Sequence, residues 1–233
     1  MRFYMLNSPK INIDFESYNK AIIYLFVGIY LSPLMFQWFI LDNDEYLILF
    51  IVCLYYLSSL FLAECVVFKE RIKNYRCFKK RLRRYIKLIF MAMMHCFGIE
   101  FCLVFISSKL ASGKSANQES ISTIPIVILL VLVLLYAPVV EEVLFRYVIR
   151  RIIRNDILFI IVSGTVFGTV HIISSIGTHS VVEVIAYSLP HLGVGYYLSY
   201  LYASTNSIEA CIITHRFLNV MAAFPIVLMY MYR

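Results

Sequence analysis

Seven stretches of this chain are apolar over roughly the 20 residues that an α-helix needs to cross about 30 Å of hydrocarbon. They are residues 21–41, 46–68, 88–107, 124–151, 157–174, 181–202 and 208–229. The runs are continuous, whereas the strands of a membrane barrel alternate apolar and polar residues, so a barrel is excluded. The sequence predicts an all-α integral membrane protein, a bundle of seven or eight transmembrane helices.

Composition agrees with a multi-pass membrane protein, because 61% of the residues are hydrophobic and only 15% are charged. An ordinary soluble domain is excluded on these values. The frequent Ile, Tyr and Lys residues indicate a bacterium with a low GC content. We therefore expect the protein in the cytoplasmic membrane of a bacterial cell.

Basic charge is concentrated in residues 69–87, which hold ten Lys or Arg against one Glu. The positive-inside rule assigns this segment to the cytoplasm, as a loop between two spans. A basic segment in that position is expected to contact anionic membrane lipids, and no nucleic-acid partner is expected. We divide the chain into residues 1–120, N-terminal transmembrane helices with a basic cytoplasmic loop at 69–87, and residues 121–233.

The second part places ionisable side chains inside its apolar runs. Glu141 and Glu142 follow about four turns of apolar residues, and a carboxylate in lipid is costly enough to indicate a functional site. Glu141 lies fifteen residues before Asp156 and His171 lies fifteen after it, so an antiparallel hairpin turning at Asn155 and Asp156 brings the two level. At 1.5 Å per residue, that level is roughly 13 Å below the cytoplasmic surface.

A third helix reaches the same depth independently. His215 follows the polar link 203–207 by eight residues, which is again about 12 Å of helix, and Asn219 projects from the same face at i+4. A carboxylate, two imidazoles and an amide then share one intramembrane polar cavity. Such a set is able to activate water and to stabilise an oxyanion.

Each of these residues also has a purely structural interpretation. A lone His or Asn inside a membrane commonly makes a hydrogen bond between helices. Glu142 is expected to pair with Arg146 at i,i+4, which fixes the helix, whereas Glu141 has no basic residue at that spacing. His191 follows Pro190, which we expect to break the sixth helix, so that His191 lines the cavity or caps the kink. His95 and Glu100 are expected to form a secondary polar network.

Three motifs occur in order on successive apolar runs: Glu141-Glu142-x-x-x-Arg146, Phe167-x-x-x-His171 and His215-x-x-x-Asn219. They resemble the EExxxR, FxxxH and HxxxN motifs of the CPBP family, the CAAX proteases and bacteriocin-processing enzymes also called the Abi family. The resemblance covers roughly residues 124–220 and marks residues 121–233 as a CPBP-like catalytic core.

The resemblance implies an intramembrane endopeptidase that cleaves a membrane-associated peptide or protein. By position in the motifs, Glu141 is the general base, His171 activates water, and His215 with Asn219 stabilises the oxyanion. Glu142 and Arg146 are then supporting residues. The family is often described as metalloproteases, and zinc held by Glu141, His171 and His215 and metal-free glutamate catalysis both remain open.

Bacterial relatives in this family are associated with bacteriocin immunity, peptide maturation or control of sensor kinases. One alternative to an enzyme is a membrane scaffold of the same fold that modulates a partner such as a sensor kinase. A transporter with a proton relay is a further alternative, but no inverted repeat supports it. Tyr147, where relatives commonly have a small residue, is expected to narrow the cavity.

Overall fold

The computed structural model describes residues 45–111, 113, 115 and 125–231, so the apolar run at 21–41 lies outside the described residues. One long helix, α3 (Glu45–Leu110), precedes the part that carries the motifs. Its successors are α5 (Ile126–Val131), η2 (Leu132–Tyr136), α6 (Ala137–Glu142), η3 (Val143–Val148), α7 (Ile149–Ile152), α8 (Asp156–Ile172), η4 (Ile173–Ser175), α9 (Val181–Thr205) and α10 (Ile208–Met231). Within the described ranges the chain forms helices and one isolated bridge, between Ile176 and His179.

Three helical stretches of the described part are long and apolar enough to cross a membrane: Ile86–Leu110, Ile126–Ile152 and Asp156–Ser175. The first half of α3 has a shorter apolar stretch, Tyr56–Cys65. α9 and α10 have sufficient length but carry more polar residues along their faces. An all-helical membrane protein is therefore supported, while the expected count of seven or eight spans stays a prediction, as does the division at residue 120.

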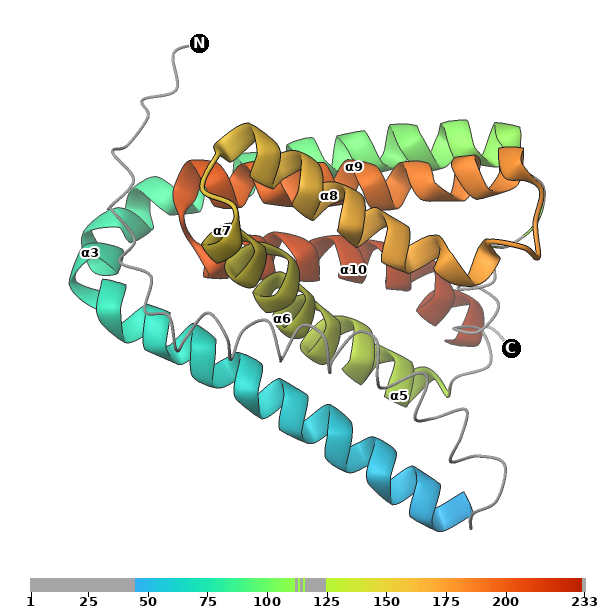
Figure 1. Cartoon of the computed structure of the whole chain (residues 1–233), viewed down its shortest axis with the longest axis horizontal. Coiled ribbons are helices and arrows are strands. Elements are labelled where there is room, and N and C mark those ends of the chain that lie inside the picture. Colours follow the sequence, from blue (N-terminus) through green and yellow to red (C-terminus); the bar gives the residue numbers. More distant parts are fainter. Residues whose placement is uncertain (1–44, 112, 114, 116–124, 232–233) are drawn as a thin grey trace.

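The basic segment 69–87 is not a loop, contrary to the sequence prediction. It is helical throughout and belongs to α3. The segment contains neither Gly nor Pro, and Lys and Arg are good helix formers, so nothing in it ends the helix. Figure 1 shows that α3 instead bends sharply near this segment, so that its second half runs back beside α9.

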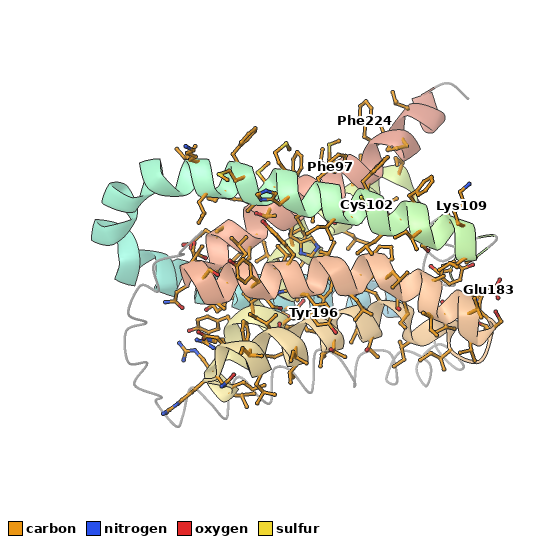
Figure 2. All side chains as sticks on the ribbon, turned by 90° about the horizontal axis from the view of Figure 1, so that it is seen from above. Phe97, Cys102, Lys109, Glu183, Tyr196 and Phe224 are labelled. Atoms are coloured by element: carbon orange, nitrogen blue, oxygen red, sulfur yellow. The ribbon has the colours of Figure 1, made fainter. Side chains whose placement is uncertain are left out.

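The connections predicted to be cytoplasmic lie together at one end of the molecule. Figure 1 shows the bend of α3, the turn between α7 and α8, and the link between α9 and α10 on the left. The connection between α8 and α9 lies at the opposite end, where Lys109 and Glu183 are also found (Figure 2). This arrangement agrees with the topology deduced from the charges.

Local signals in the sequence explain where two of the helices begin. Asn155 accepts a hydrogen bond from the backbone N–H of Leu158 at 2.9 Å, which caps α8 and confirms the predicted turn. Ser180 and Glu183 form a reciprocal capping box at the start of α9. The link to α10 turns at Asn206, which adopts the left-handed conformation with a φ of 50°.

α8 and α9 share the most extensive contact among the described helices, and glycines face each other between them. A Cβ added to Gly164 would lie 2.2 Å from the Tyr196 side chain, and one added to Gly195 would lie 2.7 Å from the carbonyl oxygen of Gly164. Small residues at such positions let helix backbones approach within a membrane. Many outward-facing side chains are apolar, and Ile157 and Val181 are 71% and 75% exposed, as expected of surfaces that contact lipid.

Candidate active site

The helix that carries both glutamates is interrupted by two π-helical turns, η2 before and η3 after α6. π turns inside α-helices occur frequently at functional sites. Glu141 and Glu142 are the last residues of α6, and adjacent helical residues point about 100° apart. Glu142 is consequently fully buried, whereas the side chain of Glu141 is 23% exposed.

Glu142 lies at the centre of a buried ion-pair cluster. Its Oε2 is 3.2 Å from Nε of Arg146, and both side chains have no exposed surface. Its Oε1 accepts a hydrogen bond of 2.8 Å from Nδ1 of His215 on α10. The predicted pairing with Arg146 is confirmed, and the second contact connects Glu142 to one of the two predicted imidazoles.

Arg146 is held by two further contacts that sequence reasoning missed. Its Nη2 donates a hydrogen bond of 3.3 Å to the carbonyl oxygen of Gly195 on α9. Its guanidinium also lies 4.5 Å above the ring of Phe167 on α8, a cation–π contact. The motif residue Phe167 and the glycines of α9 were visible in the sequence, but only the fold shows that both surround this arginine.

A chain of serine hydroxyls extends the buried cluster between α8 and α9. Ser199 donates a 2.7 Å hydrogen bond to the same Gly195 oxygen and lies 2.8 Å from Ser163. Ser163 in turn donates to the carbonyl oxygen of Phe145 at 2.7 Å. That carbonyl belongs to the π turn after Glu142, so the network supports the irregular backbone beside the glutamates.

Glu141 faces the two predicted histidines. Its Oε2 lies 3.8 Å from Nε2 of His171 and 3.8 Å from Nε2 of His215. These distances are longer than a hydrogen bond, and Oε2 is buried without a hydrogen-bond partner in the described part of the chain. The structure thus brings Glu141, His171 and His215 together from α6, α8 and α10, as the depth argument predicted.

The hydrogen bonds of the two imidazoles define which of their nitrogens carries a proton. Nδ1 of His171 lies 2.8 Å from the carbonyl oxygen of Phe167, which can only accept, so Nδ1 is the donor. Nδ1 of His215 likewise donates to the Glu142 carboxylate. In both rings Nε2 is therefore the nitrogen directed at Glu141, and it is free to exchange a proton.

His191, which we expected to line the cavity or cap a kink, packs on this group from α9. Its ring stacks on that of His171, with centroids 4.8 Å apart and an angle of 23° between the planes. α9 continues through Pro190, so the expected break in this helix is wrong. Pro removes one backbone donor, and the close packing of α9 against α8 holds the helix on both sides of it.

Among the described residues, Asn219 makes no hydrogen bond to the other three predicted catalytic residues. Its Nδ2 donates a 2.6 Å hydrogen bond to the carbonyl oxygen of Val133, in the π turn η2. An exposed π-helical carbonyl is a suitable acceptor because its normal helical donor is displaced.

Tyr147 bonds Arg151 through its hydroxyl, and His95 is exposed. Three expectations stay predictions: the cavity, its narrowing by Tyr147, and the network of His95 with Glu100.

The donor chemistry of Glu141, His171 and His215 is that of a zinc site, since a carboxylate oxygen and two imidazole nitrogens converge. As the side chains lie, however, the described residues contain no group of three or more His, Cys, Asp or Glu placed to hold a metal ion. Zinc held by these three side chains and metal-free glutamate catalysis both stay predictions.

Comparison with known proteins identifies the same part of the chain. Residues 123–221 match the family model of the Rce1-like proteins, described as type II CAAX prenyl endopeptidases. The resemblance to the CPBP family is confirmed over this segment, which is somewhat less than half of the 233 residues. The segment contains all three motifs, and the family is one of proteases.

One curated protein is similar to part of the chain. An uncharacterized protein of Mycoplasma capricolum subsp. capricolum is 27% identical in an alignment of 138 positions that covers 54% of this chain. The chain matches only 39% of the length of that relative. No solved structure matches the chain. The matched family is one of proteases, and the relative carries no named activity.

Proposed function

We propose that this protein is an intramembrane endopeptidase that hydrolyses a peptide bond in a membrane-associated peptide or protein, with Glu141 as the general base. The observation that carries the proposal is the position of the Glu141 carboxylate, 3.8 Å from Nε2 of two imidazoles that are each fixed by a bond at Nδ1. Gaps of this length suit a water molecule that bonds both a carboxylate and an imidazole.

In the first step, the nucleophilic water donates one hydrogen bond to Oε2 of Glu141 and a second to Nε2 of His171. As the water oxygen attacks the peptide carbonyl carbon, its proton moves to Glu141 and the carbonyl oxygen becomes an oxyanion. When the C–N bond breaks, Glu141 returns that proton to the leaving amine. The general base is unchanged at the end of the cycle, so the atoms and protons balance.

His215 has a different part in this scheme because its Nδ1 is bound to a carboxylate that already pairs with Arg146. We assign Nε2 of His215 to the oxyanion, and Asn219 as a second group that donates through the amide hydrogen that does not bond Val133. Glu142 and Arg146 act as supporting residues that orient His215.

For the physiological role we propose bacteriocin immunity or maturation of a peptide, the roles associated with bacterial relatives of the family that the motifs resemble. The test is to express the wild type and Glu141→Gln in the parent bacterium and to compare small membrane peptides by mass spectrometry. A general base typically contributes about 10² to 10⁴ in rate, so at least one wild-type cleavage product should disappear. Glu141→Gln should still accumulate to normal levels, because the buried oxygen of Glu141 makes no hydrogen bond in the described part of the chain that the substitution would remove. If the variant accumulates normally and leaves both the peptides and the phenotype unchanged, the protein is a scaffold that modulates a partner.

Metal dependence is decided by a separate experiment. Metal-free catalysis predicts less than one equivalent of zinc in the purified protein, and cleavage that persists after treatment with a strong chelator. If a metal takes part, cleavage should stop on chelation and return when zinc is added. Glu141→Gln treated in the same way is the matched control, because its residual rate should not respond to zinc in the metal-free case.

A further inference from the structure

His191 lies outside the three motifs and makes a ring contact with the imidazole that we assign to the nucleophilic water. The stacking geometry, 4.8 Å between centroids and 23° between planes, is that of two nearly parallel rings. Among the described residues no hydrogen bond of the His191 ring is recorded, and the side chain is half-buried. Its ring face, rather than its nitrogens, is therefore the part that contacts the site.

The close approach of α8 and α9 explains how a residue of α9 reaches His171. A Cβ added to Gly168 would lie 2.6 Å from Leu192 Cδ2 and 3.1 Å from Leu192 Cα. Gly168 is one turn before His171, and Leu192 is the neighbour of His191. The absence of a side chain at Gly168 thus lets the two backbones approach at the level of the stacked rings.

His171 has two further constraints, both from Phe167. The carbonyl oxygen of Phe167 holds Nδ1 at 2.8 Å, and the phenyl ring packs against the imidazole with centroids 4.5 Å apart. A hydrogen bond at one nitrogen still permits the ring to rotate about that bond. The stack with His191 opposes this rotation, because a rotated imidazole would collide with the flat face of its neighbour.

We propose that His191 is a positioning residue, whose ring holds the plane of His171 so that Nε2 stays directed at the water beside Glu141. This inference rests on the proposed function, since it assigns a task to a residue of the same site. It requires only a flat ring at position 191. A group that exchanged protons with substrate would require the imidazole nitrogens as well.

The test compares His191→Phe, which keeps a flat ring, with His191→Ala, which removes it. The matched control is His95→Ala, an exposed histidine of α3 that loses the same atoms. The assay follows the membrane peptide whose cleavage depends on Glu141, in purified protein and at several peptide concentrations. Thermal unfolding of each variant is measured in parallel, so that a loss of folded protein is not taken for a loss of rate.

Misplacing a catalytic group by about 1 Å can cost on the order of 10²-fold, so His191→Ala should lower kcat by roughly 10- to 100-fold with little change in KM. His191→Phe should recover most of the rate, and His95→Ala should equal the wild type. A His191→Phe variant as slow as His191→Ala, or a His191→Ala variant as fast as the wild type, would overturn the positioning role.

A second measurement does not depend on activity. Diethyl pyrocarbonate acylates a free imidazole nitrogen, and mass spectrometry reports the rate at His171. Removing the covering ring in His191→Ala should raise this rate, whereas His191→Phe should leave it unchanged; equal rates in all three proteins would refute the stack. If cleavage of no peptide depends on Glu141, the endopeptidase proposal fails. The acylation rate at His171 still decides whether His191 holds His171.

Discussion

Glu141 and Glu142 are neighbours in the chain, but they belong to two regions of the site that differ in almost every physical respect. Glu142 is fully buried and has its charge matched by Arg146 and its second oxygen bound by His215. Glu141 is partly exposed, and its buried oxygen meets two imidazoles at distances too long for hydrogen bonds. The first region has its charges paired, whereas the second is left open for a reactant.

The difference shows how a site inside a membrane separates rigidity from reactivity. A buried charge must be paired and hydrogen-bonded, and a carboxylate in that state is a poor proton acceptor. A carboxylate that accepts a proton from water needs a free lone pair. Because the two glutamates are neighbours on a helix, the site has one paired carboxylate and one carboxylate with a free lone pair. His215 contacts both.

The largest expected effect is a loss of stability when one partner of the buried ion pair between Glu142 and Arg146 is removed. Removing one partner of a buried ion pair typically costs about 3 to 5 kcal/mol, because the other charge stays buried and unpaired. Glu142→Ala and Arg146→Ala should therefore accumulate poorly and unfold at much lower temperature than the wild type.

Glu141→Ala is the matched control for this comparison, since it makes the same substitution at the neighbouring glutamate. The double change Glu142→Leu with Arg146→Met removes both charges and should restore much of the lost stability, but without activity. Unfolding of the purified proteins in detergent gives the measurement. Equal destabilisation by Glu141→Ala and Glu142→Ala would remove the distinction between the two regions.

A second, smaller effect is expected at Asn219, which the sequence assigned to the oxyanion and the structure bonds to Val133. Loss of one oxyanion donor is worth about 10² to 10³ in rate, so Asn219→Ala should leave partial activity. The lost interhelical hydrogen bond should lower stability by only about 0.6 kcal/mol. Kinetics and thermal unfolding on the same samples separate the two effects. Reduced stability at an unchanged kcat would assign Asn219 to helix packing alone.

The sequence predicted the helices of the C-terminal part and the meeting of Glu141, His171 and His215, because both depend on periodicity, turn residues and length. It could not predict the bend of α3, since a charged segment without Gly or Pro is compatible with either a loop or a helix. It also missed the Gly195 oxygen bonded to Arg146 and the stack of His191 on His171. Those contacts depend on how closely α8 approaches α9, which is a property of packing and not of either helix alone.

The smallest effect is expected far from both regions, at the cap of α9. Ser180 accepts a hydrogen bond from the backbone N–H of Glu183 at 3.3 Å and starts the helix that carries Gly195 and His191. Ser180→Ala should cost about 1 kcal/mol of stability, as loss of an N-cap usually does.

The cleavage rate should not change in Ser180→Ala, because the cap lies at the opposite end of the molecule from the turn between α9 and α10. Asn155→Ala, at the start of the helix that carries His171, provides the matched comparison, with a similar loss of stability. Unfolding and kinetics are measured for both variants. If Ser180→Ala slows cleavage as much as a change within the site, α9 transmits strain along its length, and the open region depends on more than the contacts around Glu141.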